Sequence, residues 1–191
     1  RAVALAGRIS NLVLTRFRKA RVVATAVIPR MTYSTLWSMP AAATTSNLRS
    51  RIIQCVWGFC SLMRAPEVVL GVMHDPTRLD PCFASFAHTL QTARRLMRKD
   101  GYDEPELNEG YQSRATRITQ DLKVIHKAYT ENTKDTYPKL PQGPALGVYQ
   151  AALALHTTIA FPKGVATLTF PNGSKLRLDT PHATHFATCI R

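Results

Sequence analysis

Residues 2–29 read AVALAGRISNLVLTRFRKARVVATAVIP and carry the clearest structural signal in this sequence. Apolar side chains recur there every three or four residues, which is the spacing of one face of an amphipathic helix. We predict a helix over residues 2–20 and a second helix from Arg21 to about Met39, with a kink at Pro29 because proline lacks a backbone donor. The inward positions are predicted to be Ala2, Leu5, Ile9, Leu12, Val13 and Phe17 in the first helix, and Val22, Val23, Ala26, Val27, Tyr33, Leu36 and Trp37 in the second.

Helical patterns continue after Pro40. A third helix is expected to place Leu48, Ile52, Cys55, Val56 and Phe59 inward. Pro66 predicts the first turn of a short helix whose inward positions are Val68, Val69, Val72 and Met73. Residues 74–81 are predicted to form a loop, at the end of which Asp80 caps a helix from Pro81 to about Arg98. One more helix is expected over about 109–130.

The C-terminal part has a different character. Residues 131–147 are rich in Pro and Gly and predict a linker, and residues 148–159 predict a helix. Asn172-Gly173 lies between two alternating runs, which predicts a β-hairpin at about 165–178. The predicted fold is therefore mainly α: an irregular helical bundle over 1–130, a linker over 131–147, and a small C-terminal α+β appendage over 148–191 containing one β-hairpin.

The composition excludes several classes of protein. The 191 residues are 45% hydrophobic, which is enough for a core and too much for a disordered tail. No apolar run reaches the roughly 18–20 residues of a membrane span, so we expect no membrane partner. The four cysteines show no CxxC spacing and are expected to be reduced thiols of an intracellular protein, nuclear or cytoplasmic. Because the first residue is Arg1, we expect the chain to be a piece of a longer protein.

The charge is strongly asymmetric. The formal net charge is +13, and ten basic residues precede the first acidic residue, Glu67, whereas residues 100–109 are acidic. An Arg-rich, acid-poor stretch is also typical of a mitochondrial transit peptide, but the many large apolar residues here favour packed helices. A basic helical layer favours contact with the phosphates of a nucleic acid. Part of the cluster near residue 19 also suits a helix C-terminus. The candidate binding residues are Arg8, Arg16, Arg18, Lys19, Arg21, Arg30, Arg49 and Arg51.

Catalytic motifs are missing from the sequence. It contains no Walker loop, GxSxG, HExxH or GxGxxG pattern. His182, His185 and Cys189 are suitable zinc ligands, but no fourth ligand lies nearby. We therefore predict no catalytic residue, no metal site and no cofactor in this chain.

Several segments resemble one family. The run from Arg21 to Trp37, the run from Leu48 through Trp57-Gly58, and Arg64-Ala-Pro-Glu-Val-Val-Leu-Gly71 resemble the post-palm and thumb helices of non-LTR (LINE-type) retrotransposon reverse transcriptases. His74-Asp75-Pro76-Thr77-Arg78-Leu79-Asp80-Pro81 is similar to a turn found in such elements. The resemblance covers about residues 1–98.

This resemblance implies an RNA-directed DNA polymerase context, a palm domain in a longer parent chain, and Mg²⁺ as the cofactor of that parent. The Phe/Tyr-x-Asp-Asp signature is absent from this chain, which therefore lacks the carboxylates that hold two metal ions at a primer end. The implied role is that of a thumb-like fragment that grips an RNA or RNA–DNA duplex through its phosphates. The parent would be an enzyme, whereas this segment carries no catalytic centre of its own.

Two other functions stay open at this point. A structural RNA-binding protein of a ribonucleoprotein, such as an organellar ribosome, would have the same high charge and would bind one particular RNA. A non-catalytic interaction domain would instead present its basic face to an acidic protein. In that case the acidic residues 100–109 are a possible internal cover for the basic face.

Overall fold

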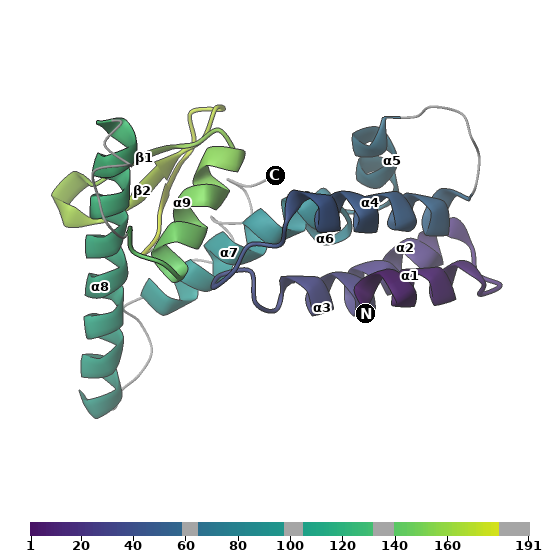
Figure 1. The fold of residues 1–191 in the computed structure, drawn as a ribbon, viewed down its shortest axis with the longest axis horizontal. Helices are drawn as coiled ribbons and strands as arrows, with labels where there is room; N and C mark the ends of the chain where they lie inside the picture. Colours follow the sequence, from purple (N-terminus) through teal and green to yellow (C-terminus); the bar gives the residue numbers. More distant parts are fainter. Residues whose placement is uncertain (59–64, 98–104, 132–139, 180–191) are drawn as a thin grey trace. The chain divides into compact units, whose positions relative to one another are not determined.

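The computed structural model describes residues 1–58, 65–97, 105–131 and 140–179 (Figure 1). The described chain is mainly α-helical and carries a small three-stranded antiparallel sheet near its C-terminal end, which confirms the predicted mainly α class. It forms two compact units: an N-terminal unit of residues 1–35 and 39–87, and a C-terminal unit of residues 36–38 and 88–191. This division falls within a helix, whereas we expected a division at residues 131–147.

The predicted helix over 2–20 is wrong in one respect, because it consists of two helices. Helix α1 (Ala2–Ser10) ends in a turn, and α2 (Arg16–Val22) begins after Thr15, whose hydroxyl accepts a hydrogen bond from the backbone N–H of Arg18. The turn resets the helical phase. As a result the three residues predicted to point inward beyond Ser10 are exposed, namely Leu12, Val13 and Phe17.

The second predicted helix is interrupted next to Pro29. A π-helical turn, Val23–Val27, follows α2, and α3 (Ile28–Thr32) has Pro29 in its first turn. The wider π turn accommodates Pro29, which has no backbone N–H to donate. The turn also shifts the helical phase of the residues that follow it. The helix ends at Thr32 and not near Met39, so two further predicted inward residues, Tyr33 and Trp37, are exposed, whereas Leu36 is buried.

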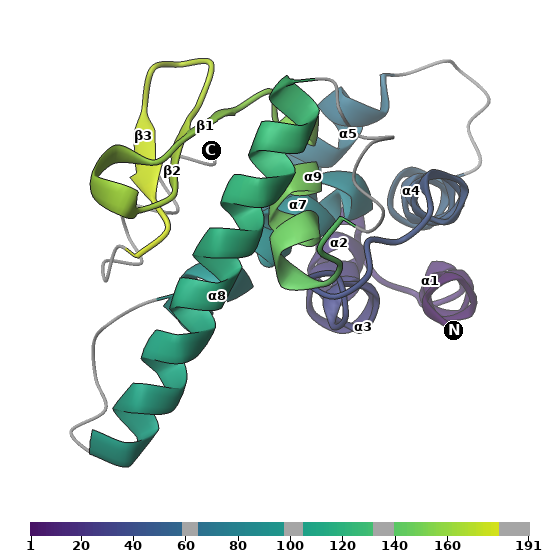
Figure 2. The ribbon, with the colours of Figure 1, turned by 60° about the vertical axis from the view of Figure 1, so that its left-hand side comes forward.

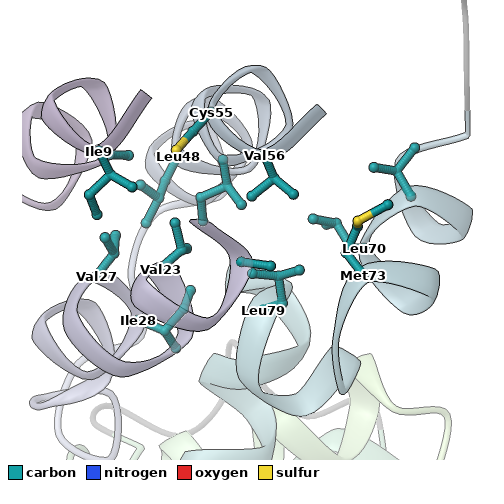
Figure 3. Close-up of a cluster of buried hydrophobic side chains, with 14 of the residues drawn as sticks. Ile9, Val23, Val27, Ile28, Leu48, Cys55, Val56, Leu70, Met73 and Leu79 are labelled. Carbon is teal, nitrogen blue, oxygen red and sulfur yellow. The ribbon is translucent and has the colours of Figure 1, made fainter. Parts of the chain in front are cut away.

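The core of the N-terminal unit lies between α4 (Ala42–Trp57) and the helices before and after it. Leu48, Ile52, Cys55 and Val56 are buried on α4 as predicted; Phe59 lies outside the described residues. Figure 3 shows Leu48, Cys55 and Val56 converging with side chains of the other helices. The partners labelled there are Ile9, Val23, Val27, Ile28, Leu70, Met73 and Leu79.

Helix α5 (Pro66–Met73) begins with a proline, as predicted, but turns a different face inward. Val69, Leu70 and Met73 are buried, whereas Val68 and Val72 are exposed, which corrects the predicted inward set. The segment 74–81, predicted as a loop, contains a single helical turn, α6 (Pro76–Leu79). This turn buries Leu79 completely.

Helix α7 (Pro81–Met97) begins where the sequence predicts it. A carboxylate oxygen of Asp80 accepts a hydrogen bond from the backbone N–H of Cys82 at 3.0 Å, which is an N-cap bond. The other carboxylate oxygen of Asp80 contacts Arg49 on α4 at 2.6 Å. Asp80 therefore both starts α7 and ties it to α4.

The C-terminal unit is built around α8 (Pro105–Thr130) and α9 (Pro144–Ala154), which lie against each other (Figure 2). Three short strands, β1 (Thr158–Ala160), β2 (Thr167–Thr169) and β3 (Lys175–Arg177), form a sheet in that order, and a 3₁₀ turn, Pro162–Gly164, lies between β1 and β2. The predicted hairpin is present as β2 and β3, and Gly173 adopts φ +80° in its turn. We predicted a helix over 148–159. Instead, α9 ends at Ala154 and Thr158–Ala160 forms β1, so the sheet has one strand more than expected.

The buried thiol of Cys55 leads to a testable expectation. Burial raises its pKa, and the nearby Lys19 charge lowers it less. Because the thiolate is the reactive form, Cys55 in the folded protein should react with iodoacetamide roughly tenfold or more slowly than the half-buried Cys82 near neutral pH. Peptide mapping by mass spectrometry measures both rates. Denaturation by urea should make the two rates similar, and equal rates in the folded protein would contradict the described burial.

In the part of the chain that the structure describes, every helix is too short or too polar to cross a lipid bilayer.

Candidate nucleic-acid interface

The N-terminal unit has a large excess of positive charge. Its sequence holds eleven Lys and Arg residues and three acidic residues, Glu67, Asp75 and Asp80, which gives a formal charge of +8. No acidic residue occurs before Glu67, so α1 to α4 carry bases alone. A surface of one sign repels itself unless a counter-charge lies on it.

Six of the predicted binding residues are exposed arginines, and within the described residues none of the six makes an ion pair with a carboxylate. Arg18 and Arg21 lie one turn apart on α2, on the side away from the fully buried Ala20. Two positive side chains at this spacing repel each other, which favours binding of an anion between them. The six are Arg8 on α1, Arg16, Arg18 and Arg21 on α2, Arg30 on α3, and Arg51 on α4.

Two of the six are oriented by neighbours that leave the charge available. The guanidinium of Arg16 lies 4.7 Å from the ring centre of Trp57, which is a cation–π contact across α2 and α4. One Nη of Arg51 donates to the side-chain oxygen of Gln54 on the same helix at 3.2 Å. Because both partners are uncharged, these contacts reduce the freedom of the side chains without neutralising them.

Lys19 has an internal role. Its Nζ donates to the backbone oxygen of Ser10, the last residue of α1, at 2.7 Å. Unpaired carbonyls and the negative end of the helix dipole are located at such a C-terminus, so a lysine there stabilises the helix. The structure therefore places Lys19 as a cap that joins the end of α1 to α2.

Arg49 is likewise engaged within the protein. One Nη lies 2.6 Å from Asp80, and the side chains are only 22% and 9% exposed. This pair connects α4 with the start of α7 and withdraws Arg49 from the set of side chains that face water. Of the eight predicted binding residues, six thus remain as surface cations and two hold the fold together.

Phe17 is a surface residue that sequence reasoning placed in the core. It is 63% exposed and stands between Arg16 and Arg18 on α2. Thr15 is the signal that would have corrected this, since a threonine before a basic run is an N-cap candidate and breaks the apolar pattern at that point. An exposed aromatic side chain among arginines is suited to stacking on a base.

The remaining sequence predictions fall largely outside the described side chains. Those of residues 100–109 are not described, nor are His182, His185 and Cys189. Within the described ranges, no three His, Cys, Asp or Glu residues gather closely enough to hold a metal ion.

A comparison of this chain with known protein families, with curated proteins and with solved structures finds no match in any of the three.

Proposed function

We propose that this chain binds RNA or an RNA–DNA duplex through its phosphates, without regard to base sequence and without a catalytic centre of its own. The role resembles that of the thumb in a retrotransposon reverse transcriptase, as a fragment of a longer parent chain. The observation that carries the proposal is the set of six exposed arginines without a carboxylate partner in the described residues: Arg8, Arg16, Arg18, Arg21, Arg30 and Arg51.

The residue type supports a phosphate ligand. The guanidinium group is planar, permanently charged and able to hold one phosphate with two donors. An ordinary solvated face mixes charges of both signs, whereas α1 to α4 carry bases alone. A nucleic-acid backbone compensates that charge, and the release of its counterions favours binding.

A steep salt dependence is the first expected result. Each phosphate contact contributes about −0.7 to −0.9 to the slope of log K against log salt, so six contacts predict a slope of about −4 to −5. Affinity should then fall roughly 10³-fold between 50 and 200 mM salt. Fluorescence anisotropy with a labelled RNA–DNA duplex of arbitrary sequence measures this.

Two outcomes of the same titration would count against the proposal. Affinity that stays constant over this salt range would show that phosphate contacts do not drive binding. Tight binding of one particular RNA, with unrelated duplexes ignored, would favour the ribonucleoprotein alternative. Duplexes of several unrelated sequences should therefore be compared at each salt concentration.

A further inference from the structure

The C-terminal unit contains a cavity of about 570 Å³ whose lining residues all belong to that unit. Its lining includes Trp37, two charged residues of α8 (Arg117 and Asp121), and the residues that lead into α9, among them Gln142 and Gly143. Protein sites for small organic ligands typically span about 300–1,000 Å³, so a mononucleotide is within the range of ligands that fit.

Trp37 supplies an aromatic face. It is 67% exposed, although a large apolar side chain is normally covered. One edge of the indole lies against Gly143, where a Cβ atom would stand 3.7 Å from Cε3 of the ring. Gly143 adopts φ +89°, a conformation that favours glycine, and α9 begins at the next residue. The exposed part of the indole offers a face on which a flat ligand can stack.

The polar side chains of the cavity offer both a cation and an anion. Arg117 and Asp121 lie one turn apart on α8, and neither makes an ion pair within the described residues. Gln142 adds an exposed amide that can donate and accept. Together these side chains match a ligand that has a flat ring, an anionic group at one end and N–H donors at the other.

We propose that this cavity binds one nucleotide whose base carries an exocyclic amine. The base stacks on Trp37, Arg117 pairs with the phosphate, and Asp121 accepts a hydrogen bond from the amine, as acidic side chains do when they recognise cytosine. The same chemistry is offered by a free mononucleotide and by an unpaired nucleotide of a strand. This proposal does not depend on phosphate binding by the N-terminal unit.

Fluorescence of Trp37 provides the test. The chain has two tryptophans, so Trp57→Phe leaves Trp37 as the only reporter. In this variant of the full chain, AMP should quench the emission, UMP should bind more weakly because uracil has no exocyclic amine, and ribose 5-phosphate should cause no quenching. Arg117→Gln should weaken AMP binding about tenfold, because it removes one charge-assisted hydrogen bond.

Lys127→Gln is the matched control. It removes the same charge from an exposed position of α8 that does not line the cavity, and AMP binding should be unchanged. Circular dichroism confirms that each variant is folded. Quenching by AMP indicates a free nucleotide as ligand, whereas quenching by an oligoadenylate alone, lost in Arg117→Gln, indicates an unpaired nucleotide of a strand.

Two results would overturn the proposal: unchanged Trp37 emission with both AMP and oligoadenylate, or equal effects of Arg117→Gln and Lys127→Gln. The outcome is also separable from that of the proposed function. Replacing Arg18 and Arg21 by glutamine should leave quenching by AMP unchanged, while it weakens duplex binding.

Discussion

Replacement of both Arg18 and Arg21 by glutamine is expected to lower the affinity for an RNA–DNA duplex roughly 25- to 60-fold at 0.1 M salt. Each phosphate contact changes the binding constant by a factor equal to the molar salt concentration raised to the power of about 0.7–0.9. The variant loses two such contacts, which gives the expected fold-change. The slope of log K against log salt should fall by about 1.4–1.8 in the same variant. Both residues are exposed on α2, so the fold should be unaffected.

The matched control removes the same charge from the other unit. Lys123 and Lys127 are exposed on α8, and their joint replacement by glutamine changes the net charge equally. Anisotropy titrations of both variants separate a local interface from a general effect of net charge. If the two double variants lose the same affinity, α2 has no special role and the proposed interface is wrong.

Asp80→Ala is expected to cost about 3 kcal/mol of unfolding free energy. The substitution removes the N-cap of α7, which contributes about 1 kcal/mol. It also leaves Arg49, whose side chain is 22% exposed, without its carboxylate. Loss of one partner of a fully buried pair costs about 3–5 kcal/mol, and the partial exposure of Arg49 lowers that cost. Urea denaturation measures the change.

Asp80→Asn separates the two contributions. The asparagine oxygen still accepts a hydrogen bond from the Cys82 N–H, but the negative charge is gone. We expect this variant to lose about 2 kcal/mol, less than Asp80→Ala. Trp57 emission in a Trp37→Phe background follows unfolding of the N-terminal unit. A change below about 0.5 kcal/mol in both variants, as for an ordinary surface position, would show that the pair does not hold α4 and α7 together.

The local elements of this protein could be predicted from short-range patterns. The spacing of Leu48, Ile52, Cys55 and Val56 correctly predicted the buried face of α4. Asn172-Gly173 predicted the turn between β2 and β3. These signals depend on contacts within four or five residues, or on the backbone freedom of a single residue, and both can be seen in the order of residues.

The phase of the helices was less predictable. The apolar pattern runs on through Leu12, Val13 and Phe17, yet these side chains are exposed because α1 ends at Ser10 and a new helix starts after Thr15. A change of phase turns the same spacing toward another face, so the three inward assignments between the break and the end of the predicted first helix fail together. The face that Phe17 presents to water depends on where α1 stops.

The roles of the charged residues depend on partners that are distant in the chain. Counting bases predicted a strongly cationic layer, but it could not distinguish Arg18 from Arg49. Asp80, which neutralises Arg49, lies 31 residues away, and the carbonyl that Lys19 caps belongs to another helix. Composition therefore determined how much charge the protein carries. Packing of the helices determined which cations face water, because an ion pair forms only where the folded backbone brings its two groups within a few ångströms.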